Sequence, residues 1–177
     1  MEACFPKLDA RPRVAELAWP DGTTAVVPQY QHVTRLPHDL AHYAVDAVLR
    51  PRWGFWELAA RKAPFSNVTP SRPWPRERQE WFARVVRDHR DEMVEAERLT
   101  GLLSGQASSW EAARRALHSA WTDRPGNPRP DLTRERYRQM LELHEALTRA
   151  WATLPLGGRL CVAWPPTAPG LRGPNSP

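Results

Sequence analysis

The positions of the prolines constrain the fold of this chain more than any other feature. Proline lacks a backbone N–H and has a fixed φ angle, so it interrupts helices and central strands. Nineteen of the 177 residues are proline, and most of them lie between segments in which apolar residues recur regularly. The prolines therefore mark element boundaries: Pro37 stands at the start of a predicted helix, and a proline-rich loop covers 63–75.

The apolar spacing between these boundaries predicts four or five helices. The predicted helices cover 37–49, 55–62, 76–104 and 131–154, and Ser108 or Ser109 can cap a further one that ends near 121. The pattern is clearest over 76–104. Its apolar residues follow alternating four- and three-residue steps, which is typical of a helix packed along another helix.

Two short segments near the N-terminus and one near the C-terminus have strand patterns. Segments 14–19 and 24–27 flank the turn signal Asp21-Gly22 and predict a hairpin, and 159–164 predicts a strand. We therefore predict an α+β fold, mainly α: a bundle of about four to five helices with a small antiparallel sheet formed by the hairpin and the C-terminal strand. One domain would cover 1–165, and 166–177 would be a disordered tail.

Charge and cysteine content narrow the class of protein. The net charge is +5, but 72–99 carries seven basic and seven acidic residues, so no concentrated basic face predicts a nucleic-acid partner. No segment has the roughly 20 apolar residues of a membrane span, and the first residues lack a signal-peptide pattern. The two cysteines, Cys4 and Cys161, have no disulfide-framework or metal-type spacing, so we expect a reduced, cytoplasmic setting.

The segment 37–49 carries the strongest functional signal. At about 100° per residue, His38, His42, Asp46 and Asp39 lie at roughly 0°, 40°, 80° and 100° around the helix. The histidine and aspartate side chains of this segment thus all share one narrow stripe. Two histidines four residues apart on one face can bind one metal ion, and Asp39 or Asp46 could add a ligand, orient an imidazole or act as a base.

Two further histidines lie on predicted apolar helix faces. His89 belongs to the regular spacing of 76–104, and His144 faces inward from 131–154. Either could complete the coordination of the ion. Glu92, one turn from His89, is an additional carboxylate candidate. Zinc is the first expectation for histidine ligands, with iron or manganese competing if carboxylates join.

A purely structural interpretation explains the same residues. The polar stripe could be the solvent-facing side of its helix, with His38 and Asp39 as first-turn polar groups, while His89 and His144 pack in the core. Against this, the exposed faces of other predicted helices use Arg and Glu, which the stripe lacks. Trp53, Phe55 and Trp56 leave the same choice open, between walls of an apolar substrate pocket and core packing.

The stripe belongs to a longer motif that resembles known sequences. Residues 36–43, Leu-Pro-His-Asp-Leu-Ala-His-Tyr, followed by Gly54-Phe55-Trp56, are similar to a motif of small bacterial proteins of unknown function. The His-Asp-x-x-His core also resembles the metal motif of the ubiquinone-biosynthesis family that removes and replaces a ring carboxyl group. The resemblance implies a metal at His38, Asp39 and His42. That family has a glutamate twelve residues after the second histidine, where this chain has Gly54; the nearest glutamate is Glu57.

A second resemblance covers fewer residues. His38-Asp39 is similar to the adjacent pair of metal-dependent phosphohydrolases of the His-Asp type. Those enzymes need another histidine on an upstream helix, whereas the segment before His38 predicts a hairpin.

The sequence therefore leads to two functional hypotheses. The first is a small metal-dependent enzyme acting on a small organic molecule, in which Asp39 and Asp46 are catalytic carboxylates. Its metal ligands are drawn from a larger set: His38, His42, Asp39, His89 and His144. The alternative is a non-catalytic helical interaction module, with a protein or nucleic-acid partner and structural histidines.

Overall fold

The computed structural model describes residues 1–9, 13–29, 35–101, 103, 110–111, 114 and 132–165, without the side chains of 92, 95 and 96. Most of the helix predicted to end near 121, the predicted cap Asp131 and the predicted tail over 166–177 lie outside these ranges. The elements are, in order, β1 (Glu2–Pro6), β2 (Arg13–Ala18), β3 (Thr24–Gln29), α1 (His38–Leu49), α2 (Phe55–Ala60), β4 (Thr69–Pro70), α3 (Arg76–Gly101), α5 (Arg134–Thr153) and β5 (Arg159–Ala163). The predicted α+β class, mainly α, is confirmed.

The strands form one antiparallel sheet with the order β4-β3-β2-β1-β5. The predicted hairpin is β2 and β3, and Gly22 adopts the positive φ of 80° that its turn requires. The predicted C-terminal strand, β5, pairs with β1 rather than with the hairpin. Sequence reasoning missed β1 because Glu-Ala-Cys-Phe-Pro contains no β-branched residue.

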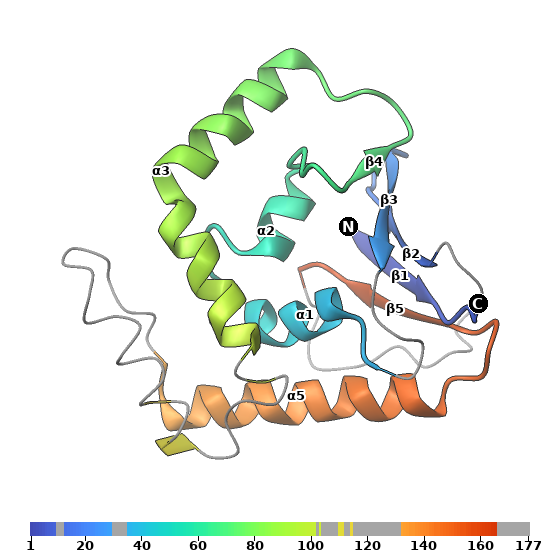
Figure 1. Cartoon of the computed structure of the whole chain (residues 1–177), viewed down its shortest axis with the longest axis vertical. Coiled ribbons are helices and arrows are strands. Elements are labelled where there is room, and N and C mark those ends of the chain that lie inside the picture. The colour runs from blue at the N-terminus through green and yellow to red at the C-terminus, as the bar shows by residue number, and fades with distance from the viewer. Residues whose placement is uncertain are drawn as a thin grey trace.

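One face of the sheet contributes to the hydrophobic core, and alternate residues of β1, β2, β3 and β5 point into it. These buried residues are Ala3, Phe5, Ala15, Leu17, Ala25, Val27, Leu160 and Val162. They pack in one cluster with side chains from α1, α2 and α5. The helices therefore cover a single face of the sheet, as Figure 1 shows.

The two cysteines lie opposite each other on adjacent strands. Cys4 on β1 pairs in register with Cys161 on β5, with a Cα–Cα distance of 4.1 Å, and the two form a disulfide. This corrects the sequence interpretation, which left them unpaired. Their separation of 157 residues gives no local spacing to recognise, and only the sheet brings them together. The expected reduced, cytoplasmic setting loses this support and stays a prediction.

Helix α1 occupies the centre of the molecule. It contacts α2, α3 and α5, and Figure 1 shows it surrounded by them beside the sheet. Every residue from Leu40 to Asp46 is buried. A helix buried on all sides is common for apolar sequences but leaves each polar side chain in need of a partner inside the protein.

Helix α3 is not straight. His89 has non-helical backbone angles (φ −128°, ψ 18°), and its ring stacks on Trp53 with centroids 4.3 Å apart. On either side of the kink the helix buries different side chains: Val85 before it, and Leu99 and Thr100 after it. None of the described helices combines the length and the apolarity of a membrane span.

A buried lysine joins the sheet to the last helix. The Lys7 ammonium, after β1, donates hydrogen bonds to the carbonyl oxygens of Trp151 (2.7 Å), Ala152 (3.3 Å) and Leu154 (2.8 Å) at the end of α5. These carbonyls have no partner within the helix, and a cation there also interacts favourably with the helix dipole.

We expect Lys7→Met to lower the free energy of unfolding by roughly 1.5–3 kcal/mol, the range for hydrogen bonds to charged groups. Urea denaturation measures this. The matched control is Lys62→Met, because Lys62 pairs with the exposed carboxylate of Asp21, and an ion pair of this kind contributes about 0–1 kcal/mol. Equal losses in the two variants would contradict the role given to Lys7.

Candidate metal centre

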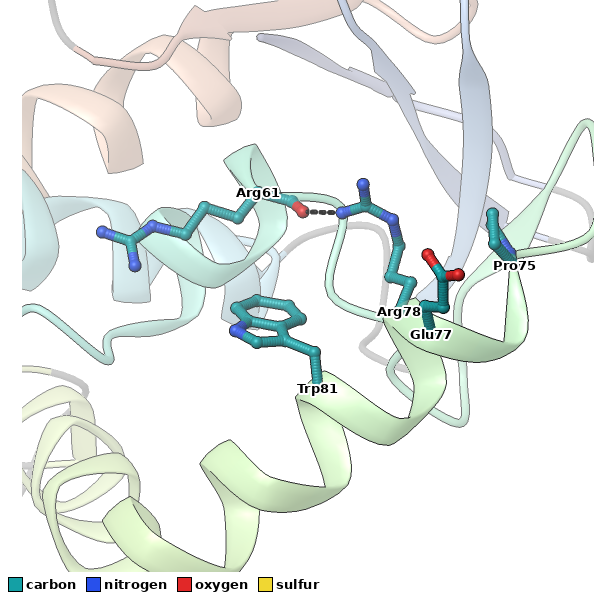
Figure 2. Close-up of a pocket in the computed structure, with 5 residues that line it drawn as sticks. All are labelled: Arg61, Pro75, Glu77, Arg78 and Trp81. Atoms are coloured by element: carbon teal, nitrogen blue, oxygen red, sulfur yellow. Dashed lines mark hydrogen bonds between the residues drawn. The ribbon is translucent and has the colours of Figure 1, made fainter.

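One pocket of the described structure lies between the end of α2 and the start of α3 (Figure 2). Its volume is about 340 Å³, and its lining residues are Arg61, Pro75, Glu77, Arg78 and Trp81. The Arg78 guanidinium donates to the Arg61 carbonyl, and the Arg61 guanidinium is held by Glu57. None of the predicted site residues lines this pocket. They lie on α1, α3 and α5.

The polar stripe of α1 faces the interior rather than solvent. His42 is 5% exposed and Asp46 is 0% exposed, while His38, at the start of the helix, has a side chain that is 39% exposed. The solvent-facing interpretation of the stripe therefore fails for its two inner members. Each of them has to be accounted for by its contacts.

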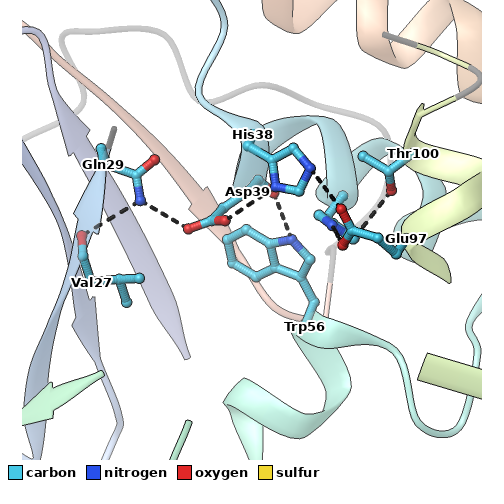
Figure 3. A network of polar contacts seen from close by, with 8 residues as sticks. Val27, Gln29, His38, Asp39, Trp56, Glu97 and Thr100 are labelled. Atoms are coloured by element: carbon cyan, nitrogen blue, oxygen red, sulfur yellow. Dashed lines mark hydrogen bonds and ion pairs between the residues drawn. The ribbon is translucent and has the colours of Figure 1, made fainter. Parts of the chain in front are cut away.

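His38 and His42 share one carboxylate, which comes from α3. Their ring centroids are 4.6 Å apart, as expected for positions one turn apart on a helix. Glu97 Oε1 lies 3.1 Å from His38 Nε2, and Oε2 lies 2.8 Å from His42 Nε2. Figure 3 shows this carboxylate beside the labelled His38 ring. One ligand atom from each residue lies within 4.8 Å of the others, so these three side chains form a group that could hold a metal ion.

The opposite edge of each imidazole has its own polar neighbour. The Thr100 hydroxyl, on α3, lies 3.1 Å from His42 Nδ1. Asp39 Oδ1 lies 3.9 Å from His38 Nδ1, and Gln29 on β3 donates to Asp39 Oδ2 at 2.9 Å. Figure 3 shows this chain of contacts running from the sheet to α3. The Nε2 atoms face Glu97, and the Nδ1 atoms face supporting groups.

The local charges favour a positive charge at this place. The carboxylates of Asp39 and Glu97 raise the pKa of His38 to about 10, and the two histidines hold the pKa of Glu97 well below its usual range. Glu97 makes the closer contact of the two carboxylates with His38, at 3.1 Å. The group is thus built to stabilise either a proton on His38 or a bound cation.

Asp46 is buried beside the N-terminus of α2. Its Oδ2 accepts a hydrogen bond from the Trp56 backbone N–H at 2.9 Å, while Oδ1 has no hydrogen-bond partner among the described residues. Burial raises the pKa of Asp46 to about 6, against opposing contributions from Trp56 and His42. A Cβ at Gly54 would lie 2.7 Å from Asp46 Oδ2, so glycine permits the close approach of the two helices.

The other predicted residues do not join the three-residue group. Asp39 accepts a hydrogen bond from Gln29, and the His89 ring stacks on Trp53. His144 lies on α5, where burial lowers the pKa of its imidazole. Their roles as ligands, and the catalytic roles of Asp39 and Asp46, stay predictions. The side chain of Glu92 lies outside the described part of the chain. Of the aromatic residues, Phe55 is near the site, 5.8 Å from His42 between ring centroids.

Sequence reasoning missed Glu97 and Thr100. Glu97 lies 55 residues after His42, in a helix whose many Arg and Glu side chains predict a solvent-exposed face. A weak signal existed: Met93 belongs to the predicted seam, Glu97 follows it by four residues, and Thr100 follows Glu97 by three, the same steps that define the seam. Glu57, the glutamate nearest to Gly54, pairs with Arg61 and accepts a hydrogen bond from Trp164 Nε1.

We expect Gly54→Ala to destabilise the protein by roughly 1–3 kcal/mol, the usual range for overpacking. The added methyl group would lie 2.5 Å from Pro51 Cγ as well as against Asp46. The control is Gly101→Ala, because a Cβ there would meet no described atom from outside its own stretch of helix within 4 Å, and alanine favours a helix by up to about 1 kcal/mol. Thermal and urea unfolding compare the two, and a loss of stability confined to Gly101→Ala would refute the packing argument.

Asp46 also predicts a pH dependence. Its pKa is about 6 in the folded protein against 3.8 for the free side chain, so its ionisation lowers the stability of the fold as pH rises through this interval. Asp46→Asn cannot ionise. We expect the stability of this variant relative to the parent to increase by roughly 2–3 kcal/mol between about pH 4 and pH 7.

Denaturation across this pH range is the measurement. Asp21→Asn is the control, since Lys62 lowers the pKa of the exposed Asp21 to about 2 and its difference from the parent should be flat above about pH 4. Parallel curves for the parent and Asp46→Asn would show that Asp46 does not titrate as described.

Comparison of the chain with protein-family models, with characterised proteins and with solved structures gives no match.

Proposed function

We propose that this protein binds a divalent metal ion through His38 Nε2, His42 Nε2 and the Glu97 carboxylate. The observation that carries the proposal is the convergence of these three ligand atoms within 4.8 Å, from two helices that meet in the core. Each ligand is of a type that divalent transition metals bind, and the two imidazoles present the same nitrogen toward the shared carboxylate.

The spacing of the ligand atoms supports this proposal. Four ligands at about 2.0–2.1 Å from a tetrahedral zinc ion lie about 3.3 Å from one another. The carboxylate oxygens lie 2.8 and 3.1 Å from the two Nε2 atoms. The three ligand atoms lie within 4.8 Å of one another, so a bound ion would require adjustment of the two exposed members, the Glu97 carboxylate and the His38 ring, which are 59% and 39% exposed.

The donor set indicates the kind of ion. Two histidines and one carboxylate form the protein ligands of catalytic zinc sites, and the same set with open positions binds iron in oxygenases. Zinc is our first assignment, with iron or manganese as the other candidates. Three protein ligands leave at least one coordination position for water or substrate.

The exposure of the ligands indicates what the ion does. His42 is buried, whereas His38 and Glu97 reach the surface, so the open position would face solvent. An ion placed there can act as a Lewis acid or activate water. We therefore propose a metal-dependent enzyme acting on a small organic molecule, with the Phe55 ring beside His42 as an apolar contact.

The raised pKa of His38 favours a second candidate. A protonated His38 paired with Glu97 would be a structural ion pair between α1 and α3, without a metal. The protein would then be a non-catalytic helical module. Metal binding separates the two candidates, because an ion pair requires no metal.

We expect the purified, untagged protein to hold one equivalent of zinc, iron or manganese after incubation and desalting, and to lose it to a chelator. An ion at 100 times its Kd would raise the stability by about 2.7 kcal/mol, which thermal unfolding detects. His38→Ala and Glu97→Gln should each weaken binding by roughly a hundredfold or more, since even groups that only support ligands cost about 10–100-fold.

Two variants serve as controls. Glu142→Gln removes an exposed glutamate on α5 that pairs with Arg138 and should leave binding unchanged. His144→Ala tests the ligand role predicted from the sequence. A parent protein that binds none of the three metals, with the same stability in the presence and absence of each, would reject the proposal and favour the ion pair.

A further inference from the structure

Thr100 is a buried polar residue whose hydroxyl approaches the metal-binding group from behind. It is 0% exposed, and its Oγ1 lies 3.1 Å from His42 Nδ1. Thr100 follows Glu97 by three residues on α3, so one helical turn supplies both neighbours of the His42 ring. Figure 3 shows Thr100 and Glu97 approaching from the same helix.

The hydrogen-bonding capacity of the ring limits what each neighbour can do. A neutral imidazole carries one N–H, and the nitrogen that binds a metal must offer a lone pair. If His42 binds through Nε2, its hydrogen has to be on Nδ1. The group opposite Nδ1 must then accept a hydrogen bond, and in this protein that group is the Thr100 hydroxyl.

We propose that Thr100 is a positioning residue for the metal centre: its hydroxyl accepts a hydrogen bond from His42 Nδ1 and so directs the Nε2 lone pair toward the ion. This inference rests on the proposed metal site. Thr100 does not touch the ion and acts only through His42.

A hydroxyl suits this position because it can reverse its role. If a neutral His42 carries its hydrogen on Nε2 and donates to Glu97 Oε2, Nδ1 needs a donor opposite it. With a metal on Nε2, Nδ1 needs an acceptor instead. A hydroxyl oxygen can donate or accept in the same place, whereas a backbone carbonyl or an ionised carboxylate can only accept.

Within the described part of the chain, His38 has no comparable support. Its Nδ1 lies 3.9 Å from Asp39 Oδ1, beyond hydrogen-bond length, and its side chain is 39% exposed. His42 is therefore the fixed ligand and His38 the adjustable one. A substitution that disturbs the orientation of His42 should consequently affect metal affinity more than its small change in volume would indicate.

The test compares Thr100→Val with Thr100→Ser, using Zn²⁺ for affinity and Co²⁺ for the absorption spectrum of the site. Valine keeps the shape of threonine but can neither donate nor accept, and we expect about 10–100-fold weaker Zn²⁺ binding. Serine keeps the hydroxyl and should restore affinity to within about threefold of the parent. Thermal unfolding without metal checks that both variants fold.

A second measurement needs no variant. Imidazole ¹⁵N NMR of the zinc-loaded parent reports which nitrogen of His42 carries the hydrogen, a property that packing alone does not set. We expect Nδ1–H with Nε2 on the metal. Binding through Nδ1 would overturn the inference, and so would equal affinity in the parent and Thr100→Val. A parent that binds no metal rejects the proposed function itself, so the two failures are distinguishable.

Discussion

The burial of α1 is the constraint on which the rest of the structure depends. A helix enclosed from Leu40 to Asp46 cannot leave His42 or Asp46 to solvent, so neighbouring elements have to supply partners for both. Helix α3 provides Glu97 and Thr100 to His42, and the backbone of α2 provides the Trp56 N–H to Asp46. The arrangement of helices around α1 is therefore also an arrangement of polar groups around its side chains.

The same burial links the stability of the fold to the geometry of the site. Asp46 is only partly satisfied, and its ionisation near neutral pH costs stability. In return its carboxylate binds the first turn of α2, and Gly54 lets that turn come close. This contact places Phe55 beside His42. A residue that looks unfavourable in isolation thus sets the position of an aromatic neighbour of His42.

Glu97, which α3 contributes, contacts both imidazoles, and this contact is compatible with two different chemical states. Glu97 stabilises positive charge, and the charge can be a proton on His38 or a metal ion held by both rings. The two states differ in which nitrogen of His42 carries hydrogen. Thr100 tolerates either state, because a hydroxyl donates or accepts in the same place. The buried half of the group, His42 and Thr100, is thus fixed by the core, while His38 and Glu97 are partly exposed.

The helices that carry the site were determined by the local pattern of the chain, because apolar spacing and proline boundaries act over a few residues. Helix α1 was predicted over 37–49 and covers His38–Leu49, and its geometry places His38 and His42 on one face. Three features were decided only by tertiary structure. Glu97 reaches the histidines across 55 residues, β1 lies between the hairpin and β5, and Cys4 meets Cys161 through the sheet. Such contacts depend on how elements pack, and no local sequence period records which distant side chain will satisfy a buried polar group.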